Sequence, residues 1–469
     1  MKLNQKILGI GRSFVTGSYL SMLMLTMKKL DAPTVRIILT AGTTYIGRFS
    51  STIAVLVNLP MARQSLSPEL FGVWMLLSAL LGFMSFADLG VGNGVLNNTT
   101  KANAKRDTKF LHRTLISGYA VTSGAGLLLY LSWLLWSCLS HESTSLVGHI
   151  SMVNRVEVMR ALTIFVFFLA INIPFSLVQK VQLGLQKGYW NGVNQLVSAL
   201  LMILAVPLTL SYGGGLSELI LATLGVQTLV NVTNTLIWLY FNNMFRMEVW
   251  FSSLDKLTTI GLLRTGSMFF VLQLAAAFAF QSDAIVISHT LGTSVYGDFA
   301  IVQKLFLFIS MILSAAMIGL WPAFGDAFTN NKIDWVIKAL KRAMLGAAVI
   351  SILLVTILSV IAPSIIEFWL KADLRPGWDL LLVLAIWTVI DAVAQVPAAF
   401  MNGAGILRAQ LLVAIAMAST AFAAKWLLTP IMGVAGAVLS TILAYCLISI
   451  PCQIYIFKKT FKTKGEHCE

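Results

Sequence analysis

Long, nearly uncharged apolar runs recur along the whole chain and constrain its fold more than any other feature. Of 469 residues, 58% are hydrophobic and 11% are charged, whereas soluble proteins average roughly 45–50% and about 25%. A run of about 20 apolar residues can cross the hydrocarbon core of a bilayer as a helix. The sequence therefore predicts an all-α polytopic membrane protein and excludes an ordinary soluble enzyme.

Breaks between the apolar runs divide the chain into about twelve predicted spans. The spans cover 37–61, 70–92, 114–137, 161–178, 190–210, 219–240, 265–288, 296–324, 344–363, 380–400, 409–428 and 433–457. We group them as a first lobe, 37–241, and a second lobe, 242–457, followed by a basic tail, 458–469. Residues 1–36 form a cytoplasmic or interfacial segment, in which 7–27 is an interfacial stretch, a result of a misplaced start, or a thirteenth span.

Basic residues are distributed unevenly between the two sides of the predicted membrane. One side holds 25 Lys and Arg and the other holds 6, if Lys425 is counted at the end of its span. The remaining two, Arg48 and Lys304, lie within spans. Because Lys- and Arg-rich segments stay in the cytoplasm, both termini are predicted to be cytoplasmic. The net charge of +14 then needs no nucleic-acid partner.

An internal repeat appears when positions 225 apart are compared. Phe71 and Gly72 correspond to Tyr296 and Gly297 at the same place in the second lobe. With six spans in each half, the repeat predicts two six-helix lobes related by a pseudo-two-fold axis along the membrane normal. A substrate would then pass between the lobes.

Three short motifs carry a resemblance to a known family. The stretch FADLGVGNG at 86–94 closes the predicted second span, LSPELFGVW occupies 66–74, and NGAG occupies 402–405. Over roughly residues 37–457 the chain resembles the polysaccharide (O-antigen unit, Wzx-type) flippases of the multidrug/oligosaccharidyl-lipid/polysaccharide (MOP) exporter superfamily.

The resemblance implies a fold and a substrate. The fold is that of two helical bundles, as in MATE transporters, around a cavity that opens alternately to the two sides. The substrate is an undecaprenyl-diphosphate-linked oligosaccharide, moved from the inner to the outer leaflet of the bacterial inner membrane for O-antigen, capsule or exopolysaccharide synthesis. A polysaccharide polymerase and a chain-length regulator are the implied protein partners.

The glycine-rich motif has a structural and a mechanical interpretation. Gly90, Gly92 and Gly94 cannot form a dinucleotide-binding loop, since no strand precedes them. With Asn93 they form either a helix terminus that permits close backbone contact or a hinge between the lobes. Asp88 is expected to pair with a basic residue of the following loop or to cap a neighbouring helix.

Charges within spans are expensive and mark functional positions. Arg48 lies roughly 16 Å into the first span at 1.5 Å per residue, and Ser51 and Thr52 continue its polar face. We therefore expect these residues to line the cavity. Lys304 in the eighth span either joins them or forms an ion pair with Asp283 of the seventh span.

A diphosphate inside the membrane needs cationic partners, because leaving its charges unsolvated is very costly. Arg48 offers a planar fork for phosphate oxygens and Lys304 a point charge. Gln273 and Gln281, on roughly one face of the seventh span, would bind the sugars or form interhelical hydrogen bonds.

Asp391 in the tenth span, with Gln395 one turn later, must be paired, protonated or bound to a cation. The resemblance suggests that Asp391 and Asp283 couple transport to a sodium or proton gradient. No cofactor and no metal site are predicted, and the four cysteines are expected to form no disulfide, since none belongs to a CxxC pair. Asn172, Ser176 and Gln179, near Pro174, are predicted to form packing contacts beside a kink.

Three other classes of protein are alternatives to a flippase. A multidrug exporter of the same superfamily would favour acidic and aromatic groups over Arg48 and Lys304. A membrane polysaccharide polymerase or ligase would carry a large outer loop with catalytic residues, and the longest outer loop, roughly 138–160, has no convincing constellation. A scaffold would not explain charges within the spans. No phosphate-binding loop for an ATP-driven pump is present in the sequence.

Overall fold

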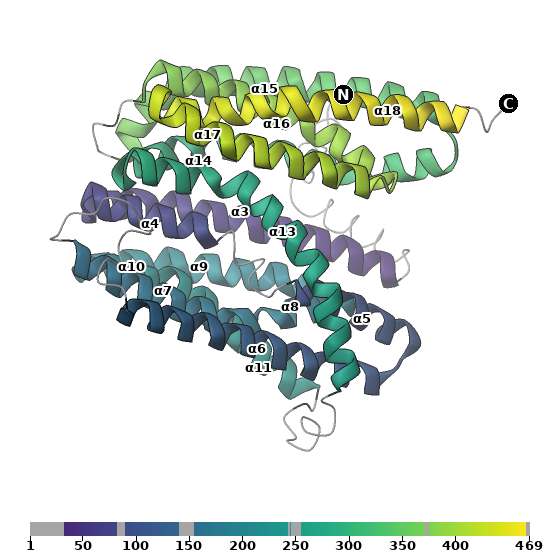
Figure 1. Cartoon of the computed structure of the whole chain (residues 1–469), viewed down its shortest axis with the longest axis horizontal. Helices are drawn as coiled ribbons and strands as arrows, with labels where there is room; N and C mark the ends of the chain where they lie inside the picture. The colour runs from purple at the N-terminus through teal and green to yellow at the C-terminus, as the bar shows by residue number, and fades with distance from the viewer. Residues whose placement is uncertain are drawn as a thin grey trace, which may run out of the picture.

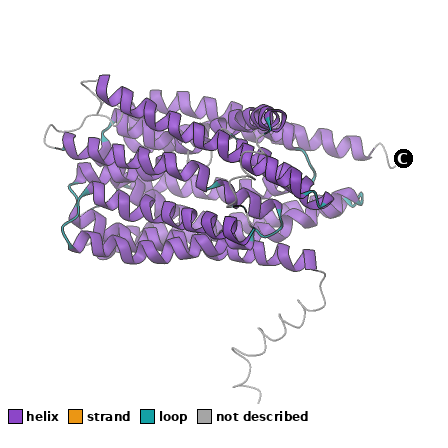
Figure 2. Ribbon diagram, turned by 90° about the horizontal axis from the view of Figure 1, so that it is seen from below, coloured by secondary structure: helices purple, strands orange, loops and turns teal. Residues whose placement is uncertain are grey.

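The computed structural model describes residues 32–81, 90–139, 154–242, 244, 255–370, 374 and 376–465. Every regular element among them is a helix, and the described part of the chain contains no strand. Figure 2 shows most of these helices side by side along one common direction. Eight of them are long and apolar enough to cross a membrane. The predicted all-α polytopic fold is confirmed.

The helices up to residue 241 pack together as the first lobe, in the lower half of Figure 1. They are α3 (Ala32–Ser65), α4 (Pro68–Leu80), α5 (Val91–Lys105), α6 (Thr108–Leu139), α7 (Arg155–Phe175), α8 (Leu177–Gly184), α9 (Tyr189–Ser211), α10 (Leu216–Ile220), the π-helical turn η3 (Leu221–Gly225) and α11 (Val226–Phe241). The most extensive contact in the structure joins α3 to α9. The first predicted span therefore lies against the fifth, along most of its length.

The remaining helices form the second lobe. They are α13 (Lys256–Thr290), α14 (Thr293–Thr329), α15 (Ile333–Leu370), α16 (Trp378–Gly403), α17 (Leu407–Ala444), the π-helical turn η4 (Tyr445–Ser449) and α18 (Ile450–Gly465). Within α17, Gly433 has φ 63° and ψ −151°, a backbone conformation that other residues rarely adopt. The helix is interrupted there, at the boundary that the sequence predicts between the last two spans.

Counted as membrane passages, the described helices agree with the predicted two-lobed architecture of about twelve spans. Three passages consist of consecutive shorter helices, α4 with α5, α7 with α8, and α10 with α11, and the break at Gly433 divides the last stretch into two passages. The domain boundary placed between 241 and 242 stays a prediction. Residues 1–31, which hold most of the predicted N-terminal segment, and Asp88 lie outside the described residues.

Helix α13 connects the two lobes by crossing from one to the other (Figure 1). Its first turns pack on α5 and α6, where Gly94 lies against Leu262, and its last turns pack on α17. Asp255 caps its start by accepting a hydrogen bond from the backbone N–H of Thr258 at 2.9 Å. A second hydrogen bond, from the Thr258 hydroxyl, lowers the pKa of Asp255 most, and the backbone bond lowers it further.

The glycine-rich motif begins a helix, which corrects the prediction that it closes the second span. Gly90 has φ 71° and directly precedes α5, which continues to Lys105. Asn93 accepts a hydrogen bond from Nζ of Lys180 at 3.3 Å. Periodicity alone could not separate a helix end from a helix start, because apolar residues flank the glycines on both sides. The hinge role of Gly90, Gly92 and Gly94 stays a prediction.

The lobes touch closely at the end where α3 turns into α4, on the left of Figure 1 and called the left end below. A Cβ atom added at Gly72 of α4 would lie 1.9 Å from the carbonyl oxygen of Thr293, at the start of α14. Only a glycine permits this approach. The repeat partner of Gly72, Gly297, lies in the same contact.

An ion pair joins the lobes at the same end. Nη2 of Arg63, in the last turn of α3, lies 3.2 Å from Oδ1 of Asp298 in α14. Gln64 donates to the carbonyl of Leu370 at 3.0 Å, and the indole of Trp369 donates to the carbonyl of Leu56 at 3.1 Å. These three links hold the left end closed.

We predict that Arg63→Ala opens the left end. The partly buried pair is worth on the order of 1 kcal/mol, so its loss should raise the open population about fivefold. Spin labels on cysteines introduced at Tyr212 and Trp378, both exposed near this end, would report the distance between the lobes, with the native cysteines replaced by serine.

The double exchange Arg63→Asp with Asp298→Arg is the control, because it restores opposite charges. It should return the distance distribution toward that of the parent. An unchanged distribution in Arg63→Ala would show that this ion pair does not hold the lobes together.

Candidate functional site

Polar side chains of the first lobe line a pocket of about 300 Å³ that reaches α14. We call it the amide pocket. Its polar lining includes Ser51, Ser78, Gln179, Asn194, Gln195, Ser198, Thr223, Gln227, Asn231 and Lys304. Among the described residues of this lining Lys304 alone is charged, and it comes from the second lobe. The pocket therefore presents neutral hydrogen-bonding groups on one side and a cation on the other.

Two further hollows continue from the amide pocket between α3 and α14. The Lys304 pocket, about 360 Å³, shares Ser51 and Lys304 with the amide pocket and adds Thr52. The Arg48 groove, about 400 Å³, adjoins it at Met311. The three hollows thus adjoin one another at shared residues, as a track between the lobes.

The predicted polar face of α3 follows this track. Ser51 and Thr52 line the Lys304 pocket, although each hydroxyl also donates to the backbone carbonyl one turn earlier. Arg48 lines the groove, one turn toward the start of α3. Its guanidinium is exposed and forms no ion pair with any described residue. Arg48 is therefore free to bind an anion.

Lys304 faces the track instead of Asp283, so the alternative of a Lys304–Asp283 ion pair is wrong. Asp283 pairs with Nζ of Lys425 at 2.7 Å, and the amide of Gln303 donates to it at 3.4 Å. The ammonium group of Lys304 forms no hydrogen bond or ion pair within the described part of the chain. Two consecutive residues of α14 therefore have different surroundings. Gln303 forms a hydrogen bond with Asp283, and Lys304 faces the pocket.

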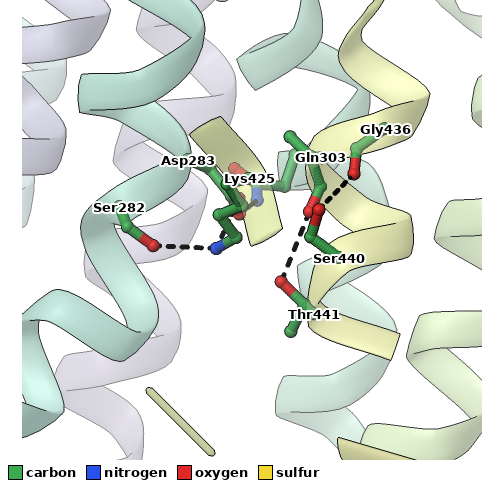
Figure 3. Close-up of polar contacts among 8 residues, drawn as sticks. Ser282, Asp283, Gln303, Lys425, Gly436, Ser440 and Thr441 are labelled. Carbon is green, nitrogen blue, oxygen red and sulfur yellow. Dashed lines mark hydrogen bonds and ion pairs between the residues drawn. The ribbon is translucent and has the colours of Figure 1, made fainter. Parts of the chain in front are cut away.

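Lys425, which the sequence placed at the outer end of its span, is buried in an ion pair of the second lobe. It lies on α17 with a side chain only 1% exposed, between Asp283 and the hydroxyl of Ser282, to which it donates at 2.8 Å (Figure 3). A buried lysine needs such compensation. The pair joins α13 to α17 within the second lobe.

Asp391 lies among three elements of the second lobe. It accepts a hydrogen bond from Gln395 of α16 at 3.1 Å and bonds the hydroxyl of Ser310 on α14. Tyr445 of η4 lies close enough to interact with its charge. Among the described residues no cation pairs with Asp391, in contrast to Asp283. The predicted coupling role of these two acids stays a prediction.

Two other predicted sugar-binding residues lie on α13. The backbone of Gln273 and Gln281 belongs to this helix, but their side chains are outside the described set.

The amides of the first lobe were missed as candidate residues. Asn194 and Gln195 lie on α9, and Gln227 and Asn231 lie one turn apart on α11. A search for amides at helical spacing within spans five and six would have found them. The predicted packing role of Asn172 and Gln179 is confirmed, since Asn231 bonds both at 2.7 Å and the helix breaks at Ser176.

Removing one partner of the Asp283–Lys425 pair should destabilise the protein. Lys425→Ala leaves a carboxylate in a buried place, and such losses cost about 3–5 kcal/mol. We expect a clearly lower Tm for purified Lys425→Ala in nanodiscs. The double variant Asp283→Asn with Lys425→Met should recover most of the loss, since a neutral packed pair replaces a buried ion pair well.

The same variants test whether Asp283 binds a driving cation. If Asp283→Asn keeps its Tm but loses its dependence on an ion gradient, Asp283 acts in coupling and the structural interpretation of the pair fails.

Comparison with known proteins connects this arrangement to a family. The family described as "Polysaccharide biosynthesis protein" matches residues 39–328, more than half of the chain. A protein of Yersinia pseudotuberculosis named "Putative O-antigen export protein" is 22% identical over 384 residues, which cover 79% of this chain and 84% of that protein.

Solved transporters share the fold. An inward-facing MATE transporter of the MOP superfamily superposes with a TM-score of 0.71 at 15% identity, covering 89% of this chain and 95% of its own. An outward-facing MATE structure gives 0.61 at 16% identity, with coverages of 93% and 97%. A MOP transporter from Pyrococcus furiosus gives 0.59 at 14% identity, with coverages of 93% and 96%. The chain belongs to the polysaccharide biosynthesis protein family, and its fold is that of the MATE transporters of the MOP superfamily.

Proposed function

We propose that this protein flips undecaprenyl-diphosphate-linked oligosaccharide repeat units from the inner to the outer leaflet of the bacterial inner membrane by alternating access. The product would supply O-antigen, capsule or exopolysaccharide synthesis, with a polymerase and a chain-length regulator as downstream partners. Membership of the polysaccharide biosynthesis family and the name of the Yersinia relative support this substrate class.

The observation that carries the proposal is the pair of uncompensated cations along the track. A charge inside a span is costly, and proteins keep it only where it is paired or used. Asp283 and Lys425 satisfy this rule by pairing with each other. Arg48 and Lys304 both line the track without such a partner among the described residues. A diphosphate carries the charge that would compensate them.

The surroundings of Arg48 suit a lipid-linked substrate. Ile46, Phe49 and Ile312 line the Arg48 groove and are 57%, 44% and 47% exposed. In a bilayer such apolar side chains meet lipid chains, so a polyprenyl tail can remain in the membrane while its diphosphate reaches the track. An exporter of organic cations would instead be opposed by two positive charges at this place.

The charge distribution supports the orientation that we propose. The turn between α5 and α6, at the end opposite the left end, follows Lys101, Lys105 and Arg106 and precedes Lys109. With this end in the cytoplasm, both termini are cytoplasmic. The closed left end then faces outward, in agreement with the higher TM-score for an inward-facing relative.

Removing either positive charge that lines the track should stop export without unfolding the protein. We expect Lys304→Ala and Arg48→Ala each to lower flipping at least about tenfold, because a charge-assisted hydrogen bond contributes about 1.5–3 kcal/mol. Arg48→Lys should keep part of the activity, since it retains the charge but not the fork. The measurement is the amount of lipid-linked oligosaccharide left in the inner leaflet of cells that lack the native gene.

Lys187→Ala is the matched control, because Lys187 is exposed and lies outside the three hollows of the track. It should export normally. Normal export by Lys304→Ala at parental protein levels would remove Lys304 from the substrate path, and transport of organic cations instead would favour the multidrug alternative.

We further propose that Asp391 couples transport to a sodium or proton gradient. Its hydrogen bonds come from neutral groups, so the carboxyl can accept a proton or bind a cation. Asp391→Asn should lose gradient-driven flux in vesicles while it still binds the lipid-linked substrate. Asp334→Asn, an exposed acid in the first turn of α15, serves as control. Undiminished gradient-driven flux in Asp391→Asn would assign Asp391 to packing.

A further inference from the structure

The amide pocket contains buried donors that no described residue satisfies. Nε1 of Trp74, a side chain only 5% exposed, and Nδ2 of Asn194 are both buried without a hydrogen-bond partner. Gln195 and Gln227 line the same pocket, and neither side chain forms a hydrogen bond with the described residues. Buried donors are normally paired in folded proteins. Two buried unpaired donors beside the exposed Gln195 and the half-buried Gln227 therefore indicate a ligand with several acceptors.

A second row of amides fixes the wall behind these groups. Gln179 donates to Asn231 at 2.7 Å, and Asn231 donates to Asn172 at 2.7 Å. Asn191 of α9 donates to the backbone carbonyl of Gln179 at 3.1 Å. These bonds tie α7, α8, α9 and α11 together. The wall is therefore held in place before a ligand arrives, which lowers the entropic cost of binding.

The lining also defines the chemistry of the ligand. Amides both donate and accept hydrogen bonds, as do sugar hydroxyls and N-acetyl groups. Val55, Met75 and Met202 supply apolar surface, and the indole of Trp74 adds a flat aromatic face. Among the described residues, no carboxylate lines the pocket and Lys304 is its only charge. The pocket suits a neutral sugar attached to an anion.

We infer that the amide pocket is a carbohydrate subsite for the sugar nearest the diphosphate, recognised by Trp74, Asn194, Gln195 and Gln227. This inference rests on the proposed flippase function. Lys304, which lines both the amide pocket and the next pocket along the track, holds the diphosphate beside this sugar. Residues of the first lobe then bind the sugar, and Lys304 of the second lobe supplies the positive charge that binds the diphosphate.

Two probe lipids separate sugar recognition from diphosphate binding. One is undecaprenyl diphosphate, and the other is undecaprenyl diphosphate bearing a single N-acetylhexosamine. Purified protein in nanodiscs should bind the sugar-bearing lipid more tightly. Asn194→Ala and Gln227→Leu should each weaken that binding about tenfold and leave the bare lipid unaffected, because only the sugar meets these amides. Lys304→Ala should weaken the binding of both lipids.

Thr233→Ala is the control, since Thr233 is an exposed residue of α11 outside the amide pocket. It should bind both lipids as the parent does, and an unchanged Tm for each amide variant verifies folding. Equal binding of the two lipids by the parent, or an equal loss for both in the amide variants, would overturn the subsite while keeping the flippase proposal. Absence of binding of either lipid, or binding indifferent to Lys304→Ala, would instead overturn the proposed function and the subsite with it.

Discussion

Compensation of polar groups inside the bilayer is the constraint on which this structure depends. Hydrocarbon offers no hydrogen bonds, so each buried charge or amide needs a partner within the protein. The second lobe meets this need with the Asp283–Lys425 pair and the first lobe with the amides around Asn231. Against this background, Lys304 and Arg48 are two cations of the spans that pair with no described residue. Because both cations line the same track between the lobes, they are suited to bind an anionic substrate there.

The lobes depend on one another through a small number of contacts. At the left end Gly72 brings α4 against the start of α14, and Arg63 pairs with Asp298. Toward the opposite end, the first turns of α13 pack against helices of the first lobe, whereas its last turns pack within the second lobe. A helix that belongs to both lobes transmits motion of one to the other. Separation at the left end must therefore break the ion pair and change how α13 packs.

Sequence patterns predicted the membrane passages well, because each span is a local property of about 20 residues. The break near Gly433 followed from the same reasoning, since a glycine after a proline interrupts an apolar run. The partner of Asp283 could not be predicted in this way. Lys425 lies 142 positions away on another helix, and periodicity identifies a face of a helix but not the helix that it meets. The amides of α9 and α11 were missed for a related reason, since amides are neutral and do not interrupt an apolar span.

Helix α14 links substrate binding to the contact between the lobes. It carries Asp298 of the left-end ion pair and, six residues later, Lys304 of the track, a rise of about 9 Å along the same helix. A rigid helix cannot move one of these residues without the other. Release of Asp298 from Arg63 therefore shifts Lys304 relative to the amide wall, which is fixed in the first lobe by its own hydrogen bonds. A ligand held by both Lys304 and that wall would in turn bias the ion pair, because a ligand favours the conformation that it binds more tightly.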